Sequence, residues 1–235
     1  MTQSAPTLSA KAQQFIDSVL SRRPRIAVFD CDGTLWKADS GERFFYWEMN
    51  RGLVSEDVAT KLRARYEMYR RGEVSEDAMC GEMVTMHEGI PCNAIERAAA
   101  DFFPEVVAPG IFPEMKVLSH LLIENDCELW AISSTNDWVV TAGVREFGVP
   151  ADHVLAACVA KQNGSATNRL TRMPSGEGKA VAIREVIRRT PDAAFGNSRW
   201  DQAMLELARH PYAINPNPDL EKIAADRGWT IYKPV

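Results

Sequence analysis

Apolar and polar residues follow two different periods along the chain, and these predict helices and short buried strands. Near the N-terminus, residues 12–20 carry apolar side chains at helical spacing, which predicts an amphipathic helix. Residues 26–29 form a continuous apolar run, as expected of a strand buried on both faces. We expect residues 1–7, before the first helix, to form a loose tail.

The pattern between Asp39 and Val107 is helical throughout, with no convincing strand. Ser55-Glu56-Asp57 and Ser75-Glu76-Asp77 each open a helix, with a capping residue followed by acids in the first turn. We therefore expect an inserted helical domain over residues 38–107. The remaining domain would combine residues 1–37 with residues 108–235.

Strands and helices alternate in the second half of the chain. The expected strands are residues 129–132, 154–159, 193–195, 212–214 and 229–232. The expected helices are residues 113–124, 137–147, 178–189, 200–208 and 219–227. Asn163-Gly164 is a hairpin turn signal. This alternation predicts an α/β fold, a Rossmann-like parallel sheet flanked by helices, with the all-helical segment inserted into it.

Composition narrows the possible partners. The chain has 235 residues, 46% of them hydrophobic, and a net charge of -5 without a basic stripe, so no nucleic-acid partner is expected. Its five cysteines are scattered without a CxxC pair, which indicates reduced thiols in a cytoplasmic protein. Residues 1–10 lack the features of a signal peptide, and no apolar run approaches membrane-spanning length. The sequence does not indicate the oligomeric state.

Two carboxylates follow the first apolar run, in the stretch Asp30-Cys31-Asp32-Gly33-Thr34. Acids at the end of a buried strand are costly unless a cation joins them, and a divalent, oxygen-loving ion such as Mg²⁺ is the natural partner. Gly33 permits a sharp turn and a close approach of another group to the backbone.

Polar residues also follow two other predicted strands. Ser133 and Ser134 end one of them, and Asn197 ends another, with Asp201 four residues later. Lys179 opens a helix after a glycine-rich loop. Because ligands gather at the carboxyl ends of parallel strands, we expect these groups to converge.

This inventory suits phosphoryl transfer, which depends on positioning and charge neutralisation. A carboxylate serves as the nucleophile, Ser133 and backbone N–H groups hold phosphate oxygens, and Lys179 neutralises charge. The expected Mg²⁺ ligands are Asp30, Asp32, Asn197 and Asp201. Three of these residues could instead have a structural role: Ser133 as a helix cap, Asn197 as a turn residue and Asp201 as a first-turn acid. Lys161 is an alternative to Lys179 as the lysine of the site.

Asp30-Cys31-Asp32-Gly33-Thr34-Leu35 resembles the first motif of the haloacid dehalogenase superfamily in its phosphatase form. Leu129–Ser133, Gly178-Lys179 and residues 196–205 resemble the second, third and fourth motifs, in the same order. Asn197 departs from the pattern, because an acid is usual there. An Asn amide oxygen can still ligate Mg²⁺, with one negative charge fewer.

The resemblance implies a Mg²⁺-dependent phosphatase that acts through an aspartyl-phosphate intermediate on a small phosphorylated metabolite. Asp30 would be the nucleophile and Asp32 the general acid and base. The implied catalytic residues are Asp30, Asp32, Ser133 and Lys179. The implied substrate-binding residues are Gly33, Thr34, Asp39 and Ser134.

The inserted helices lie where this superfamily carries a cap, and the arrangement most resembles the phosphoserine-phosphatase-like branch. Asp39 follows Asp32 by seven residues, the offset at which phosphoserine phosphatases carry an acid that binds the substrate's amino group. Its alternative roles are an exposed turn acid or a helix cap. No arginine is well placed to match the carboxylate clamp of that branch, and Arg63 and Arg65 are candidates only. The expected substrate therefore shifts from phosphoserine towards phosphocholine or phosphoethanolamine.

Further residues of the insertion carry weaker expectations. The aromatic run of residues 44–47 could cover a quaternary ammonium by cation–π contact. Most of the aromatic and methionine side chains of the insertion are expected to form its own core: Phe44, Phe45, Tyr46, Trp47, Tyr66, Tyr69, Met79, Met83 and Met86. We expect His87 to be a surface or packing residue.

Three other functions compete with this hypothesis. A metal-free dehalogenase of the same superfamily lacks an acid two residues after the nucleophile, so Asp32 argues against it. A receiver-like phosphate-binding domain is about half this length and has no inserted cap. A non-catalytic binding scaffold is the third alternative.

Overall fold

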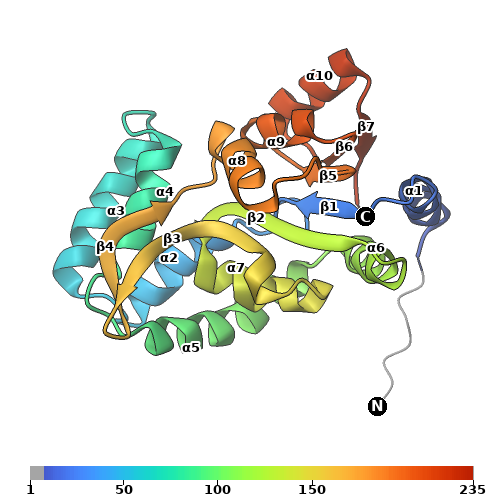
Figure 1. The fold of residues 1–235 in the computed structure, drawn as a ribbon. Helices are drawn as coiled ribbons and strands as arrows, with labels where there is room; N and C mark the ends of the chain where they lie inside the picture. Colours follow the sequence, from blue (N-terminus) through green and yellow to red (C-terminus); the bar gives the residue numbers. More distant parts are fainter. Residues whose placement is uncertain (1–7, 235) are drawn as a thin grey trace.

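The computed structural model describes residues 8–234, so the tail expected over residues 1–7 lies outside the described part. Its centre is a seven-stranded sheet with the order β4-β3-β2-β1-β5-β6-β7 (Figure 1). The strands are β1 (Ile26–Phe29), β2 (Glu128–Asn136), β3 (Val154–Gln162), β4 (Ser165–Arg172), β5 (Ala193–Gly196), β6 (His210–Ile214) and β7 (Thr230–Tyr232). All neighbouring pairs are parallel except β3 and β4, which form an antiparallel hairpin. The predicted α/β architecture is confirmed.

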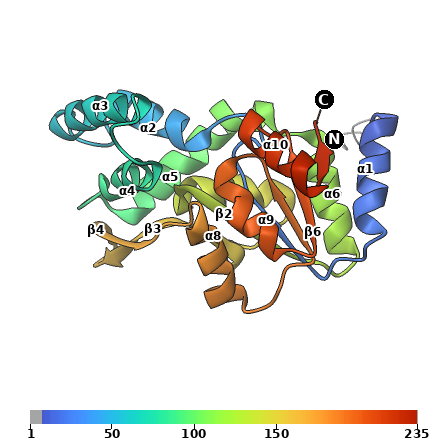
Figure 2. The ribbon, with the colours of Figure 1, turned by 90° about the horizontal axis from the view of Figure 1, so that it is seen from above.

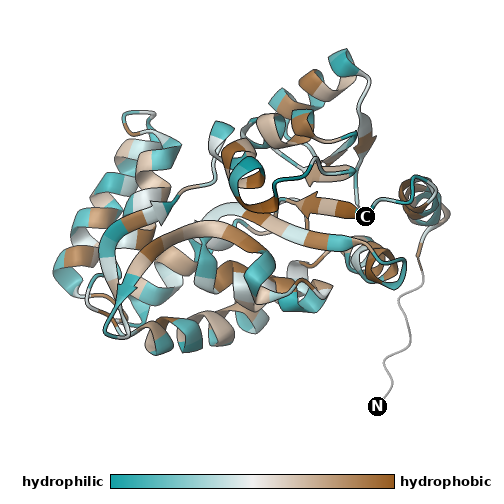
Figure 3. Cartoon of the chain, in the orientation of Figure 1, coloured by the Kyte–Doolittle hydropathy of each residue, from teal (hydrophilic) through white to brown (hydrophobic). Residues whose placement is uncertain are grey.

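Helices cover both faces of this sheet. One face packs against α1 (Ala10–Leu20), α6 (Pro113–Glu124) and α7 (Asp137–Val144), and the other against α8 (Glu177–Ala182), α9 (Gln202–Leu207) and α10 (Pro218–Arg227) (Figure 1). Strand β1 contributes alternate residues to the two cores, because successive side chains point to opposite faces of a sheet. Figure 3 shows the apolar colour concentrated on β1, which lies between β2 and β5.

The boundaries differ from expectation at a few points. Strand β2 continues four residues beyond Ile132 to Asn136, which then caps α7 by accepting a hydrogen bond from the N–H of Val139 at 2.9 Å. The hairpin predicted at Asn163-Gly164 is confirmed, and both residues have positive φ, 51° and 79°. None of the helices within residues 8–234 combines the length and apolar character that crossing a membrane requires.

Five α-helices lie between β1 and β2 along the chain. The first four are α2 (Ser40–Asn50), α3 (Glu56–Arg70), α4 (Glu76–Thr85) and α5 (Cys92–Phe102), and α2, α3 and α4 lie on the side of the molecule where β3 and β4 are (Figure 2). Ser55 and Ser75 cap α3 and α4, as their sequences predicted. Helices α2, α3 and α4 share an apolar cluster of their own, which includes Phe45 and Met79.

Helix α4 is held beside the sheet by the β3–β4 hairpin. Gly89, in the turn after α4, donates to the carbonyl of Ala166 at 2.9 Å, and Ala166 donates back to the carbonyl of Ile90 at 2.9 Å. The N–H of Cys92 donates to the carbonyl of Gly164 at 2.8 Å. These bonds satisfy backbone groups of the edge strand β4 and place α4 against the carboxyl end of β2.

Candidate active site

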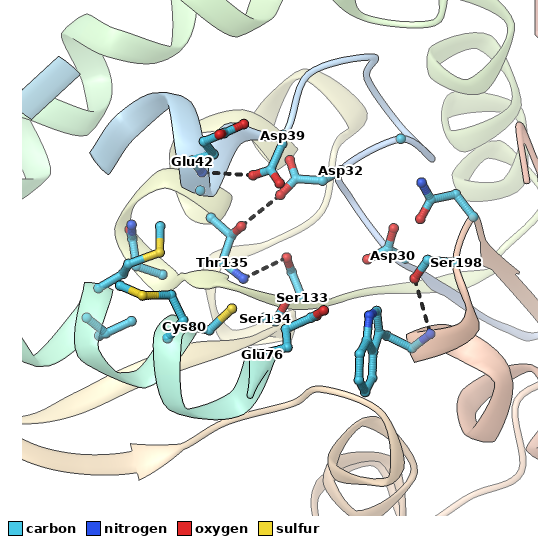
Figure 4. A pocket seen from close by; sticks show the side chains of 18 of the residues that line it. Asp30, Asp32, Asp39, Glu42, Glu76, Cys80, Ser133, Ser134, Thr135 and Ser198 are labelled. Carbon is cyan, nitrogen blue, oxygen red and sulfur yellow. Dashed lines mark hydrogen bonds between the residues drawn. The ribbon is translucent and has the colours of Figure 1, made fainter. Parts of the chain in front are cut away.

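Three adjacent strands end at one cavity of about 280 Å³. Strand β1 ends at Phe29, just before Asp30. Strand β2 carries Ser133 among its last four residues, and β5 ends at Gly196, just before Asn197. Because β1 lies between β2 and β5, their carboxyl ends meet, as the strand pattern predicted. Helices α2, α3 and α4 close the other side of the cavity. Figure 4 shows side chains from both sides pointing into it.

Asp30 is buried at the centre of this arrangement. Its Oδ2 accepts a hydrogen bond from the hydroxyl of Thr34 at 2.8 Å, and its Oδ1 accepts one from Lys179 Nζ at 2.7 Å. Its backbone N–H donates to the carbonyl of Phe195 on β5, which fixes the strand end. Burial and the charge of Asp201 raise the pKa of Asp30 to about 7, although Lys179 opposes this shift.

Lys179 reaches the site from α8 and is itself 2% exposed. Its ammonium group donates to Asp30 at 2.7 Å, to Asp201 Oδ1 at 2.6 Å and to the carbonyl of Ile132 at 3.1 Å, so all three donors are used. Burial by itself lowers the pKa of Lys179, but the two carboxylates more than offset this and hold its pKa above the ordinary value. Lys161 is exposed and lies 3.9 Å from Asp137, so the structure places Lys179 in the cluster and Lys161 outside it.

Asp201 joins the cluster to the loop after β5. Its Oδ2 accepts the backbone N–H groups of Asn197 and Ser198, both at 2.9 Å. The side chain of Asn197 lies close to Gly33: a Cβ added to Gly33 would be 1.9 Å from Asn197 Nδ2. Gly33 also has a φ of 75°. The turn after β1 and the loop after β5 thus touch at this glycine, for the two reasons that the sequence suggested.

Asp32 lies beside Asp39, the residue before α2 (Figure 4). Its Oδ1 accepts hydrogen bonds from Trp36 Nε1 at 2.6 Å and from the N–H and hydroxyl of Ser40 at 2.9 and 2.6 Å. Its Oδ2 accepts one from the hydroxyl of Thr135 at 2.7 Å. Thr135 was missed by the sequence analysis, although it lies in the same polar run as Ser133.

The end of β2 supplies hydroxyl groups to the cavity. Ser133 is buried, and its Oγ accepts a hydrogen bond from the N–H of Thr135 at 3.2 Å. Ser134 lines the cavity and contacts Cys80 of α4 by a hydrogen bond. Since Asn136 caps α7, Ser133 does not serve as that helix cap.

The residues fit a hard divalent ion in their donor chemistry. Asp30, Asn197 and Asp201 offer only oxygen donors, as Mg²⁺ prefers, and sit together at the strand ends. The raised pKa of Asp30 shows that the polypeptide alone stabilises its ionised form poorly, which a nearby cation would reverse. Within residues 8–234, no three His, Cys, Asp or Glu side chains already form a metal-ready group.

The helical wall of the cavity is rich in acids, and Lys37, in the loop before α2, is the basic residue beside it among the described lining residues. The wall contains Asp39, Glu42, Tyr66, Tyr69, Glu76, Met79, Cys80, Met83 and Val84. Asp39 caps α2 by accepting the N–H of Glu42 at 2.8 Å, so it is both a helix cap and a cavity residue. Desolvation by the surrounding protein, together with the charge of Asp32, raises the pKa of Asp39 to about 7, although the residue as a whole is exposed.

Three expectations for the insertion need correction. Residues 44–47 do not line the cavity; Phe44 and Phe45 are fully buried because they face the apolar cores, and Tyr66 and Tyr69 occupy the wall instead. Arg63 bonds Asn50, and Arg65 pairs with Glu82, so neither arginine reaches the cavity. The two cavity tyrosines and the acids Glu42 and Glu76 had no local signal that separates them from surface or core residues.

His87 is not a surface residue, since it is 0% exposed. Its Nε2 lies 2.7 Å from Glu48 Oε2 on α2, and its Nδ1 lies 3.0 Å from the carbonyl of Val84. Its ring packs edge-on against Trp138 of α7. His87 therefore joins the inserted helices to one another and to the sheet domain.

The comparisons with known proteins agree with this geometry. The profile of the haloacid dehalogenase-like hydrolases matches residues 27–206. A histidinol-phosphatase of Neisseria meningitidis is 24% identical over 88% of this chain and 97% of its own length. A phosphoserine phosphatase of Mycobacterium tuberculosis is 27% identical over 87% of this chain and 69% of its own length.

Solved structures share the fold. A protein of unknown function from Bordetella pertussis superposes with a TM-score of 0.76 at 24% identity, over 88% of this chain and 97% of the other. A substrate-bound phosphoserine phosphatase superposes with a TM-score of 0.60 at 14% identity, over 89% of this chain and 92% of the other. With the strand-end cluster and the matched profile, these likenesses show that the chain belongs to the haloacid dehalogenase-like hydrolase family and is a hydrolase of phosphoric monoesters.

Proposed function

We propose that this protein is a Mg²⁺-dependent phosphatase that hydrolyses a small phosphomonoester through an aspartyl-phosphate at Asp30. The observation that carries the proposal is the buried cluster of Asp30, Lys179 and Asp201 at the end of β1, open to a cavity of metabolite size. The end of β1, the segment after β5 and the start of α8 supply its groups, and such fixed positioning of charged groups is what phosphoryl transfer requires.

In the first step, a carboxylate oxygen of Asp30 attacks phosphorus, and the bond from phosphorus to the ester oxygen breaks. Asp32 donates a proton to the departing alcohol. In the second step, Asp32 takes a proton from a water molecule, whose oxygen attacks the phosphorus and releases inorganic phosphate, restoring Asp30. The four hydrogen bonds on Asp32 hold its carboxyl group on the side where the leaving alcohol would sit.

The phosphate oxygens would be held by the Ser133 hydroxyl and by N–H groups near Gly33 and Ser134, while the positive charge of Lys179 would neutralise part of the phosphate charge. Mg²⁺ would be held by Asp30, Asn197 and Asp201, and when bound it neutralises charge on the phosphate and the nucleophile. Both oxygens of Asp32 already accept hydrogen bonds, which argues against direct ligation of the metal by its side chain. Thr34 supports the nucleophile through its hydrogen bond to Asp30.

Helices α2–α5 would act as a cap over this site, within the domain proposed for residues 38–107. Such a cap excludes water and selects the leaving group. Asp39 would bind a cationic amine of the substrate. Among the described residues that line the cavity, the basic ones are Lys37 and Lys179, so a substrate carboxylate would lack the bidentate partner that an arginine provides. Phosphoethanolamine, phosphocholine and histidinol phosphate fit this wall better than phosphoserine.

The five free thiols support a cytoplasmic location.

The test is hydrolysis of p-nitrophenyl phosphate with Mg²⁺ and with EDTA, in the wild type and in Asp30→Asn. We expect Mg²⁺-dependent turnover that Asp30→Asn abolishes without changing the circular dichroism spectrum, because an amide is a poor nucleophile. Asp77→Asn is the matched control, since Asp77 is exposed and lies outside the cavity. Wild-type turnover in Asp30→Asn would refute the mechanism, and full activity in EDTA would refute the metal requirement.

A further inference from the structure

Glu76 lines the cavity but takes no part in the mechanism proposed above. It occupies the first turn of α4, directly after the capping residue Ser75. Its carboxyl group points into the cavity from the α4 side, close to Ser134, as Figure 4 shows. Within the described part of the chain, it makes no hydrogen bond and no ion pair. The next residue, Asp77, is exposed and lies outside the cavity.

The charges around Glu76 place it between the phosphate end and the leaving-group end of the cavity. Burial raises its pKa to about 7, the positive charge of Lys179 opposes this shift, and the negative charge of Asp39 adds to it. An ionised Glu76, which is near enough to feel the charge of Lys179, would repel an incoming phosphate ester. The repulsion is offset if the leaving group itself brings a positive charge to Glu76.

Asp39 and Glu76 belong to different walls. Asp39 lies with Glu42 at the start of α2, whereas Glu76 lies at the start of α4, across the end of β2 (Figure 4). A compact ammonium group held by Asp39 leaves Glu76 without a partner. A leaving group with a second nitrogen, set apart from the first, would satisfy both acids.

The surfaces beside Glu76 suit a flat, partly apolar group. Tyr66 and Tyr69 of α3 also line the cavity, as do Met79 and Met83, which follow Glu76 by three and seven residues on one face of α4. Aromatic rings and thioether groups pack against a heterocycle and leave its nitrogen to a carboxylate. The wall thus combines packing surface with two separated hydrogen-bond acceptors.

We infer that Glu76 is a specificity-determining residue that accepts a hydrogen bond from a second basic nitrogen of the leaving group, while Asp39 binds its ammonium. The substrate class is the phosphate ester of an amino alcohol that carries an additional basic nitrogen, such as an imidazole. This inference rests on the proposed function and narrows it, because phosphoethanolamine and phosphocholine have only one nitrogen.

The experiment compares kcat/KM for histidinol phosphate, phosphoethanolamine and glycerol phosphate in the wild type, Glu76→Gln and Asp77→Asn. Asp77→Asn removes the same charge from the same helix turn and controls for the helix dipole and net charge. We expect the wild type to prefer histidinol phosphate. Glu76→Gln should lower the ratio of kcat/KM for histidinol phosphate over phosphoethanolamine by about ten- to a hundredfold, the range for a charge-assisted hydrogen bond.

The inference is overturned if Glu76→Gln leaves that ratio unchanged, or if Asp77→Asn lowers it as much. It is also overturned if the wild type hydrolyses phosphoethanolamine as well as histidinol phosphate. Hydrolysis of p-nitrophenyl phosphate by the wild type separates this failure from that of the proposed function. Turnover of that substrate without the ratio change refutes the role of Glu76 alone, and absence of all turnover refutes the phosphatase mechanism.

Discussion

Replacing Gly33 by alanine would test the contact between the turn after β1 and the loop after β5. Gly33 has a φ of 75°, a backbone conformation that costs an L-residue about 1–2 kcal/mol. The added Cβ would also lie 1.9 Å from Asn197 Nδ2 and 2.7 Å from its Cγ, far inside van der Waals contact. Gly33→Ala therefore has to displace the Asn197 side chain, the turn, or both.

Gly72 provides a matched control for the backbone term. Its φ is 76°, and an added Cβ would meet nothing within 4 Å. Gly72→Ala should lose about 1–2 kcal/mol of unfolding free energy and keep the activity of the wild type. Gly33→Ala should lose at least as much stability. It should also need about tenfold more Mg²⁺ for half-maximal rate, the usual consequence of displacing a group that orients a metal site.

Urea unfolding followed by circular dichroism measures the first quantity, and a Mg²⁺ titration of p-nitrophenyl phosphate hydrolysis measures the second. The difference between the two variants isolates the clash from the backbone strain. If Gly33→Ala matches Gly72→Ala in stability and keeps the Mg²⁺ dependence of the wild type, Asn197 is not positioned by this contact and does not ligate the metal.

Three further outcomes follow from the site and from the inserted helices. Asn197→Asp should lower the Mg²⁺ concentration needed for half-maximal rate, because it restores a negative charge; a Mg²⁺ titration with no change would contradict this. Asp32→Asn should slow turnover by roughly 10²–10⁴-fold while inhibition by inorganic phosphate persists, and unaltered turnover would exclude its proton-transfer role. Burial lowers the pKa of His87, but Glu48 and its hydrogen bond more than offset this and hold the pKa above 6.5. The stability from this pair is full below pH 6.5, down to the pH at which Glu48 takes up a proton, and burial raises the pKa of Glu48. It is lost as pH rises through the raised pKa of His87, so urea unfolding at several pH values should show a fall in stability that His87→Gln reduces; equal pH slopes would argue against the pair.

The sequence by itself determined the sheet and the polar residues that line the cavity at the strand ends. Each of these features has a local cause: short apolar runs form buried strands, and polar residues directly after them must lie at the strand ends. Because parallel strands align their carboxyl ends, the sequence alone predicts that Asp30, Ser133 and Asn197 lie close together, as they do in the structure. Lys179 followed from the helix that its glycine-rich loop begins.

Only the tertiary structure decided which residues of the inserted helices line the cavity. An amphipathic helix shows which side chains are buried, but its pattern does not distinguish a core from a cavity. The packing of α4 against the β3–β4 hairpin turned Glu76 toward the strand ends and Asp77 toward solvent, and the packing of α2 buried Phe44 and left the cavity wall to Tyr66. Such orientations depend on contacts between distant segments, which no local period encodes.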